Sequence, residues 1–377
     1  MVERPAARPA RPYFSSGPCA KPPGWSLSSF DIEALGRSHR GAIGKARLAE
    51  AIERTHALLQ LPADYKLGIV PASDTGAMEM AMWSLLGTRP VTMLAWESFG
   101  AGWVTDVAKQ LKLDADIRTA DYGDIARLGG IDPASDIVFT WNGTTSGVRV
   151  PDAHWIAADR TGLSICDATS AAFAQPIDWQ KIDVGTFSWQ KALGGEAAHG
   201  MIVLSPRAVE RLEREPSPRP LPKIFRLTKG GKLIDGIFRG ETINTPSMLC
   251  VEDWLHALGW AEQLGGLNAL IARANANAQA LDAWVAEADW IEHLATDPAI
   301  RSNTSVCLQF SDRTDPDANT KRQKAMAKLL EQEDAAYDVG AYRDAPPGLR
   351  IWCGATVETA DIEALGPWLD WAWEMTK

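Results

Sequence analysis

Long apolar runs, an excess of basic charge and a regular cysteine pattern are all missing from this sequence of 377 residues. No apolar stretch reaches the roughly 18 residues that a membrane-spanning helix requires. Lys and Arg number 38 against 48 Asp and Glu, giving a formal net charge of -10, whereas nucleic-acid binding needs a clustered basic face. We therefore expect neither a membrane nor a nucleic acid as partner, although a few converging arginines could still bind a small anion.

Cysteines are few and scattered. They are odd in number and form neither a CxxC pair nor a metal-ligand spacing: Cys19, Cys166, Cys250, Cys307 and Cys353. We expect reduced thiols, no bound metal and a cytoplasmic location. Residues 1–12, MVERPAARPARP, lack the apolar core of a signal peptide, and their prolines oppose a helix, so we expect a flexible leader there.

Length and composition predict two domains. Hydrophobic residues make up 46% and charged residues 23%, as in an ordinary globular protein. Short apolar runs alternate with helical periodicity, the pattern of an α/β domain with a mainly parallel sheet. We place this large domain at 13–250 and a smaller α+β domain at 251–377. Strands of the large domain are expected at Lys66–Val70, Val91–Ala95, Ile137–Thr140, Leu163–Cys166, Val184–Phe187 and Met201–Leu204.

Helical periodicity falls between and after these strands. The proline-rich segment Glu215–Pro222 marks the end of the large sheet or of its last helix. Helices are expected at Ala77–Leu86, Gly102–Leu111, Asp253–Leu264 and Leu267–Trp284, and small-domain strands at Ser305–Phe310 and Leu349–Trp352.

Lys191 is a candidate for covalent chemistry. It follows an expected strand end and precedes the glycine-rich turn Gly194-Gly195, so its amine would face a cleft. Lysine amines form Schiff bases with aldehydes once burial or neighbouring cations lower the pKa, and pyridoxal phosphate is anchored in this way. A solvated surface lysine is the alternative, and the more common one for a lysine taken alone.

Asp167 strengthens that interpretation. It closes an apolar strand two dozen residues before Lys191, at the strand end where open α/β sheets bind ligands. A buried carboxylate beside the pyridine nitrogen keeps it protonated, so that the ring withdraws electrons from the substrate Cα. Asp167 could also be the N-cap of the next helix, and the two roles do not exclude each other.

Two further loops follow strands. Asp74, Thr75 and Gly76 open a helix, whose free N–H groups and dipole suit the cofactor phosphate, although the same residues are common in turns and caps. Thr144, in the loop Trp141–Gly147, could hydrogen-bond the phenolic oxygen of the cofactor.

From about Tyr13 to near its C-terminus the chain resembles the class V aminotransferases of fold type I, and among them the phosphoserine aminotransferase family. This fold has a large domain with a mainly parallel seven-stranded sheet flanked by helices and a smaller α+β C-terminal domain. The resemblance rests on motifs in the order that the family has them: Ser16-Gly17-Pro18, Ser38-His39-Arg40-Gly41, Asp74-Thr75-Gly76, Asn142-Gly143-Thr144, Cys166-Asp167, Ser188-Trp189-Gln190-Lys191, Asn244-Thr245-Pro246 and Gly348-Leu349-Arg350.

The resemblance implies a cofactor site for pyridoxal 5′-phosphate. Lys191 would carry the cofactor and Asp167 would face its pyridinium nitrogen. Either Trp103 or Phe99 would stack on the ring, with core packing as the alternative for both. The remaining implied cofactor contacts are Asp74, Thr75, Gly76 and Gln190 to the phosphate, Thr144 to the ring hydroxyl, and Asn244 and Thr245 to the phosphate of the other subunit's cofactor, which requires a homodimer.

The resemblance also implies how substrates bind. Arg350 would clamp the α-carboxylate, which a planar guanidinium fits better than an ammonium does. His39 and Arg40 would meet the second anionic group. One departure is Tyr342, which stands where many relatives carry the histidine of a His-Arg pair; Arg343 could still serve. Arg226, Lys229 and Lys232 could add positive charge or lie in a solvated loop.

The implied reaction moves an amino group between L-glutamate and 3-phosphohydroxypyruvate, giving O-phospho-L-serine and 2-oxoglutarate in serine biosynthesis. A phosphorylated hydroxythreonine of vitamin B6 synthesis is a possible second substrate. The alternatives are a serine or alanine aminotransferase using glyoxylate, a desulfurase, and a non-enzymatic regulatory module. Cys353 lies in an apolar strand, which disfavours the desulfurase, and retention of Lys191 without a DNA-binding domain disfavours the module.

Overall fold

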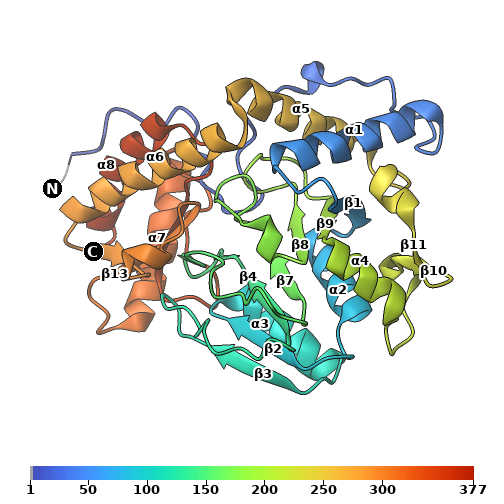
Figure 1. The fold of residues 1–377 in the computed structure, drawn as a ribbon. Coiled ribbons are helices and arrows are strands. Elements are labelled where there is room, and N and C mark those ends of the chain that lie inside the picture. The colour runs from blue at the N-terminus through green and yellow to red at the C-terminus, as the bar shows by residue number, and fades with distance from the viewer. Residues whose placement is uncertain (1–2) are drawn as a thin grey trace.

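The computed structural model describes residues 3–377. A large α/β domain holds one seven-stranded sheet, and a smaller unit built from the C-terminal third of the chain lies beside it (Figure 1). Both chain ends lie on the outer side of the smaller unit in that view. None of the helices described for residues 3–377 is long and apolar enough to span a membrane.

The sheet of the large domain is mainly parallel, as expected. Its strand order is β1-β9-β8-β7-β4-β2-β3, and only β9 runs antiparallel to its neighbours. The strands are β1 (Lys66–Pro71), β2 (Val91–Ala95), β3 (Ala115–Thr119), β4 (Asp136–Thr140), β7 (Ser164–Asp167), β8 (Val184–Ser188) and β9 (His199–Leu204).

Apolar residues cover both faces of this sheet. In β9, Met201 and Val203 pack into the core on one face, whereas Ile202 and Leu204 pack into the core on the other. A strand buried on both faces must be apolar at every position, which explains why these strands are continuous apolar runs. The first core includes α1 (Ala42–Leu58) and α5 (Met248–Leu264), and the second includes α2 (Ser73–Leu85), α3 (Ser98–Thr105) and α4 (Pro206–Arg214).

Smaller elements complete the large domain. The proline-rich segment Glu215–Pro222 directly follows α4, as expected for a segment that ends a helix. The other elements are the π-helical turn Asp106–Gln110, the two-stranded pairs β5 (Asn142–Gly143) with β6 (Val148–Arg149) and β10 (Thr228–Lys229) with β11 (Lys232–Leu233), and the 3-10 helices Leu27–Ser29, Trp179–Lys181, Lys223–Phe225 and Asp235–Arg239.

The smaller unit has its own apolar core. It forms around a three-stranded antiparallel sheet in the order β12-β13-β14. Its elements are α6 (Gly266–Glu287), β12 (Ile291–His293), the 3-10 helix Pro298–Ile300, β13 (Ser305–Phe310), α7 (Pro316–Gln332), β14 (Gly348–Trp352) and α8 (Thr359–Met375). Because α5 and the first half of α6 pack on the large-domain core, the boundary at residue 250 stays a prediction.

The segment before α1 links both cores. Phe14 is fully buried in the small-domain core, and its carbonyl accepts a hydrogen bond from the Trp352 N–H at 3.0 Å. Within the expected leader, the carbonyl of Ala7 accepts from the Trp368 indole at 2.7 Å. Residues 1–2 lie outside the described residues, and the flexibility of 1–12 stays a prediction.

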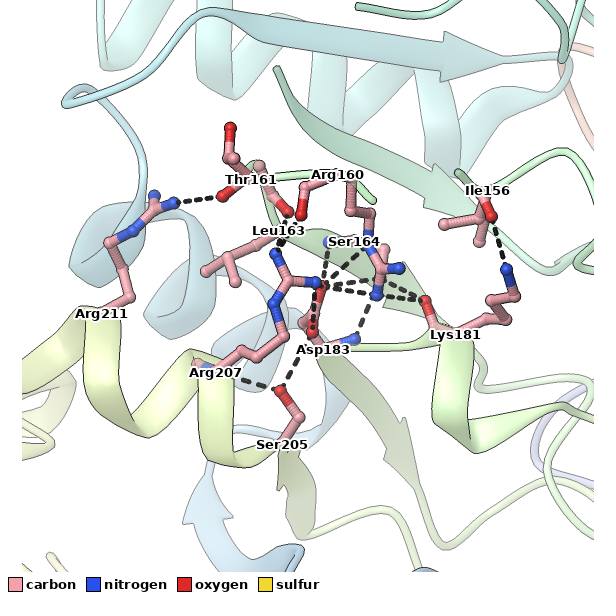
Figure 2. Close-up of polar contacts among 12 residues, drawn as sticks. Ile156, Arg160, Thr161, Leu163, Ser164, Lys181, Asp183, Ser205, Arg207 and Arg211 are labelled. Atoms are coloured by element: carbon pink, nitrogen blue, oxygen red, sulfur yellow. Dashed lines mark hydrogen bonds and ion pairs between the residues drawn. The ribbon is translucent and has the colours of Figure 1, made fainter. Parts of the chain in front are cut away.

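A buried ionic cluster holds the amino ends of the strands together (Figure 2). Asp183, directly before β8, accepts hydrogen bonds from Arg160 at 3.0 Å, from Arg207 at 3.2 Å and from the N–H of Ser164 at 2.9 Å. The carboxylate is almost completely buried, so these donors replace the water that it loses. This cluster lies at the opposite ends of the strands from the residues considered next.

Candidate active site

Several of the residues predicted from the sequence lie at one edge of the large sheet. β1, β2, β4, β7 and β8 all run in one direction, so their carboxyl ends lie together. α2 follows β1, Asp167 closes β7 and Lys191 follows β8. Ligands in open α/β sheets bind at this edge.

Lys191 is buried, with 8% of its surface exposed. Its Nζ donates a hydrogen bond to the carbonyl oxygen of Ser16 in the N-terminal segment. A Cβ at Gly17 would lie 2.5 Å from this Nζ, so glycine leaves the room that the amine needs. Burial lowers the pKa of Lys191, and the nearby charge of Arg350 acts in the same direction. A lowered pKa favours the neutral amine, which is the form that attacks an aldehyde.

Asp167 is held by two donors. Its Oδ2 accepts from the indole N–H of Trp103 at 3.2 Å, and its Oδ1 accepts from the N–H of Thr169 at 3.0 Å. Of the two candidate aromatics, Trp103 therefore contacts the acid. Phe99 is 39% exposed and packs on Tyr342, with ring centroids 5.7 Å apart.

Asp74 lies next to Asp167 at the start of α2. Burial, and then the charge of Asp167, raises the pKa of Asp74 well above its usual value. Its Oδ1 has no hydrogen-bond partner within residues 3–377. The raised pKa favours a protonated carboxyl, which can donate a hydrogen bond to an anion, as an ionised one cannot.

The turn into α2 is tight and strained. Ala72 and Ser73 both adopt left-handed conformations, with φ of 66° and 53°. A Cβ at Gly76 would lie 2.8 Å from the Ala72 Cβ and would overlap the carbonyl of Pro71. Thr75 is exposed in the first helical turn. The start of a helix offers free backbone N–H groups, the feature that suggested a phosphate site in the sequence.

Glu97 belongs to this region, although the sequence analysis did not single it out. It is the N-cap of α3, accepts hydrogen bonds from the Gly100 N–H at 2.7 Å and the Thr145 hydroxyl at 2.8 Å, and is 4% exposed. Burial raises the pKa of Glu97 to about 7. An acidic residue soon after a buried strand was the feature that pointed to Asp167, and the same feature could have identified Glu97.

Thr144 and Gln190 lie beside the same cleft. The Thr144 hydroxyl shares a hydrogen bond with Ser170, and its carbonyl accepts from the Ser305 hydroxyl at 2.6 Å. The backbone carbonyl of Gln190 accepts from the Cys19 N–H at 2.8 Å, while its buried side-chain Oε1 has no partner in the described part of the chain.

The two expected substrate arginines of the small domain differ. Arg350, on β14, contributes positive charge at Lys191, and its buried Nε finds no acceptor among the described residues. Arg343 is 79% exposed and lies 3.5 Å from Asp344. Only Arg350 is thus presented to the region around Lys191. Tyr342 lies over Arg350, with 5.5 Å between the guanidinium carbon and the ring centroid.

His39 and Arg40 form a separate group. They line a cavity with Thr242 and Ile243, and Lys191 is not part of its lining. Asn244 and Thr245 follow directly; the Asn244 amide donates to the Thr245 carbonyl at 3.2 Å. The single chain therefore has two separate groups of predicted site residues. One group is expected around the cofactor ring, and the other around the second anionic group.

Comparisons with known proteins identify the family. A scan against protein-family models finds no match. The phosphoserine aminotransferases of Methanosarcina mazei and Methanosarcina barkeri are each 56% identical to the chain over 375 residues, covering 99% of the chain and all of each relative. The chain belongs to the phosphoserine aminotransferase family. This confirms the resemblance inferred from the motifs.

Solved structures confirm fold type I. A phosphoserine aminotransferase of Bacillus circulans matches with a TM-score of 0.79 at 20% identity, over 97% of this chain and 99% of that one. A pyridoxal-phosphate-bound phosphoserine aminotransferase of Trichomonas vaginalis gives 0.74 at 18%, over 96% and 99%. Ureidoglycine-glyoxylate aminotransferase of Bacillus subtilis gives 0.78 at 14%, over 99% and 95%. The fold alone therefore does not select the substrate.

The residues of this cleft fit pyridoxal phosphate, the cofactor of the phosphoserine aminotransferase family. A buried polar atom without a partner costs about 1–3 kcal/mol, so a cluster of them indicates a ligand with matching atoms. Such atoms gather here in the described chain: Asp74 Oδ1, Thr169 Oγ1, Ser188 Oγ, Gln190 Oε1 and Arg350 Nε.

Proposed function

We propose that the chain is a cytoplasmic, homodimeric phosphoserine aminotransferase. It transfers the amino group of L-glutamate to 3-phosphohydroxypyruvate, giving 2-oxoglutarate and O-phospho-L-serine. The observation that carries this proposal is 56% identity to phosphoserine aminotransferases over nearly the whole chain, with a buried amine and a buried carboxylate at the expected sheet edge. Five free cysteines support a reducing compartment.

Each cofactor group has a proposed partner in this chain. Lys191 would bind the aldehyde carbon, Asp167 would face the ring nitrogen and Trp103 would stack on the ring. The indole hydrogen bond to Asp167 supports Trp103 over Phe99. The start of α2, with Asp74, Thr75 and Gly76, holds the phosphate together with Gln190, and Thr144 meets the ring hydroxyl.

The side chains then move one proton and hold two anionic groups. When bound, pyridoxal phosphate supplies an electron-withdrawing ring that stabilises negative charge at the substrate Cα. Lys191 Nζ would take the proton from the substrate Cα and deliver it to the C4′ carbon of the cofactor. Its lowered pKa supports this role, because a neutral amine is the base that the step needs. Arg350 clamps the α-carboxylate, with a guanidinium whose Nε lacks an internal partner.

The second anionic group is assigned to His39 and Arg40. These residues and the neighbouring Asn244 and Thr245 lie apart from Lys191 in the single chain. A twofold dimer that presents them to the Lys191 cleft of the partner would complete both sites at once. The separation of the two groups supports the homodimer.

A panel of amino donors and acceptors tests the activity. We expect glutamate or phosphoserine to convert the bound cofactor to its amine form, seen as loss of the visible absorbance band, and 3-phosphohydroxypyruvate to restore the band. The panel also includes phosphohydroxythreonine, serine and alanine as amino donors, and glyoxylate as an acceptor. A preference for alanine and glyoxylate would contradict the proposal, and no response to any donor would favour a regulatory module.

The variant Arg40→Ala distinguishes a phosphoserine aminotransferase from an aminotransferase that uses glyoxylate. Loss of a charged hydrogen-bond partner should raise KM for phosphoserine by about tenfold or more, while that for alanine changes little. Equal losses for both donors would show that Arg40 does not recognise the phosphate.

Borohydride reduction of the loaded protein, followed by peptide mapping, is expected to place the label on Lys191.

A further inference from the structure

A basic cavity of about 550 Å³ lies between the start of α1, the β10–β11 hairpin and the 3-10 helix Asp235–Arg239. The hairpin and this helix lie at the side of the large domain away from the small one (Figure 1). Six basic side chains line the cavity: His39, Arg40, Lys45, Lys223, Arg226 and Lys229.

These charges are poorly compensated inside the protein. Glu241, the acidic residue of the lining, forms an ion pair with Lys45, with 2.7 Å between Oε1 and Nζ. The Nε of Arg226 donates a hydrogen bond to the carbonyl oxygen of Leu221 at 3.0 Å. The two terminal nitrogens of its guanidinium take no part in this bond. Within residues 3–377, no carboxylate forms an ion pair with Arg226, Lys229 or Arg40. Arg40, Arg226 and Lys229 are exposed to solvent, so their charged groups are accessible to a bound anion.

A second observation points to a ligand. His39 is 8% exposed, and its Nε2 is buried without a hydrogen-bond partner in the described chain. Its position is fixed by the first turn of α1, because a Cβ at Gly44 would lie 2.5 Å from the His39 Cα. The turn is thus closely packed against His39, and the Nε2 of its imidazole is available to a ligand.

The start of α1 adds to the same field. This helix has 17 residues, no side-chain cap and no acidic residue in its first turn. Arg40 and Lys45, on either side of its N-terminus, both line the cavity. The positive end of the helix dipole therefore adds to the charge of these side chains. Ile234, Ile237 and Ile243 provide apolar lining, which strengthens electrostatic attraction to a bound anion.

We propose that Arg226 and Lys229 are specificity-determining residues that bring further positive charge to a phosphomonoester dianion held by His39 and Arg40 in this cavity. A carboxylate is satisfied by one bidentate guanidinium, whereas a dianion with three terminal oxygens matches several cations from two chain segments. The proposal rests on the proposed function where the dianion is the substrate's phosphate. It also accounts for Arg343, whose side chain is 79% exposed: Arg226 and Lys229 supply the cations that the loop before Arg350 does not.

Calorimetric titration of the loaded enzyme with inorganic phosphate, at constant ionic strength, tests the cavity. Loading prevents the cofactor site from taking up the probe. Arg226→Ala and Lys229→Ala should each weaken phosphate binding by about tenfold. Lys232→Ala is the matched control: like Lys229, this residue is an exposed lysine of the β10–β11 hairpin, but it pairs with Glu213 at 2.9 Å and does not line the cavity. It should change binding less than about twofold.

Inhibition kinetics separate the two sources of the dianion. Competition between inorganic phosphate and phosphoserine, with KM for phosphoserine raised about tenfold in Arg226→Ala, would assign the cavity to the substrate phosphate. Phosphate binding that depends on Arg226 without such competition would assign it to a free anion. Phosphate affinity in both cavity variants equal to that of Lys232→Ala would overturn the proposal. An enzyme without activity on phosphoserine, whose phosphate binding still depends on Arg226, would overturn the proposed substrate and leave the cavity standing.

Discussion

Three buried carboxyl groups and one buried amine meet at the carboxyl edge of the sheet, and their surroundings give them different roles. Asp167 accepts two N–H donors, from Trp103 and Thr169. Burial, and then the charge of Asp167, raises the pKa of Asp74, which is suited to donate a proton. Glu97 caps a helix, and burial raises its pKa to about 7. Chemically similar side chains are thus distinguished by their neighbours.

Glu97→Gln should alter how stability depends on pH. The pKa of Glu97 is raised from 4.5 to about 7 by folding, so between these values the folded chain binds more protons than the unfolded chain. Stability from this group is therefore lost as pH rises through that window. Gln cannot ionise, so the variant should gain on wild type by at most about 3 kcal/mol across the window. Urea unfolding of both proteins at several pH values measures this, and parallel curves would refute it.

At the scale of elements, the strand positions could be predicted from sequence and the polar elements could not. The six expected strands occur with ends shifted by at most two residues, because strands buried on both faces are continuous apolar runs. β3, Ala115–Thr119, has no such run because it is a largely exposed edge strand. The helix expected at Gly102–Leu111 instead begins at Ser98 and ends in a π-helical turn.

Gly76→Ala should damage the turn into α2. Its Cβ would meet the Ala72 Cβ at 2.8 Å and overlap the Pro71 carbonyl, which would shift the N–H groups proposed to hold the cofactor phosphate. We expect weaker cofactor binding by about tenfold or more. Gly102→Ala is the control, since a Cβ there meets nothing within 4 Å and alanine favours a helix. Equilibrium dialysis of the cofactor compares them, and equal affinities would count against a role for this turn.

At the scale of the molecule, the ionic cluster and the proposed catalytic residues occupy opposite edges of one sheet. Asp183→Ala would leave Arg160, whose side chain is 5% exposed, without its carboxylate. We expect a loss of about 3–5 kcal/mol in the free energy of unfolding, with KM unchanged in the folded fraction. Glu210→Ala removes the exposed Arg214–Glu210 pair and should cost less than about 0.5 kcal/mol. Denaturant unfolding separates the two, and Asp183→Asn replaces alanine if that variant does not fold.

Subunit mixing tests the shared sites of the proposed dimer. Lys191→Ala and Asn244→Ala should each be inactive or strongly impaired alone. In a mixed dimer one site carries both changes and the other carries neither, so unfolding and refolding an equal mixture should restore about a quarter of wild-type activity. Light scattering establishes that dimers form. No recovery in mixed dimers would place Asn244 and Lys191 in the same subunit's site.

The sequence by itself determined the family and the fold class, and it predicted the residues that are proposed to carry the chemistry. It could do so because Asp74, Asp167 and Lys191 follow apolar strands, and parallel strands bring their carboxyl ends to one edge. Only the tertiary structure decided how those groups are paired: Trp103 contacts Asp167, Arg343 faces solvent and Arg226 joins His39 around one cavity. Burial, pKa and charge pairing depend on neighbours distant in the chain, and local sequence patterns do not specify those neighbours.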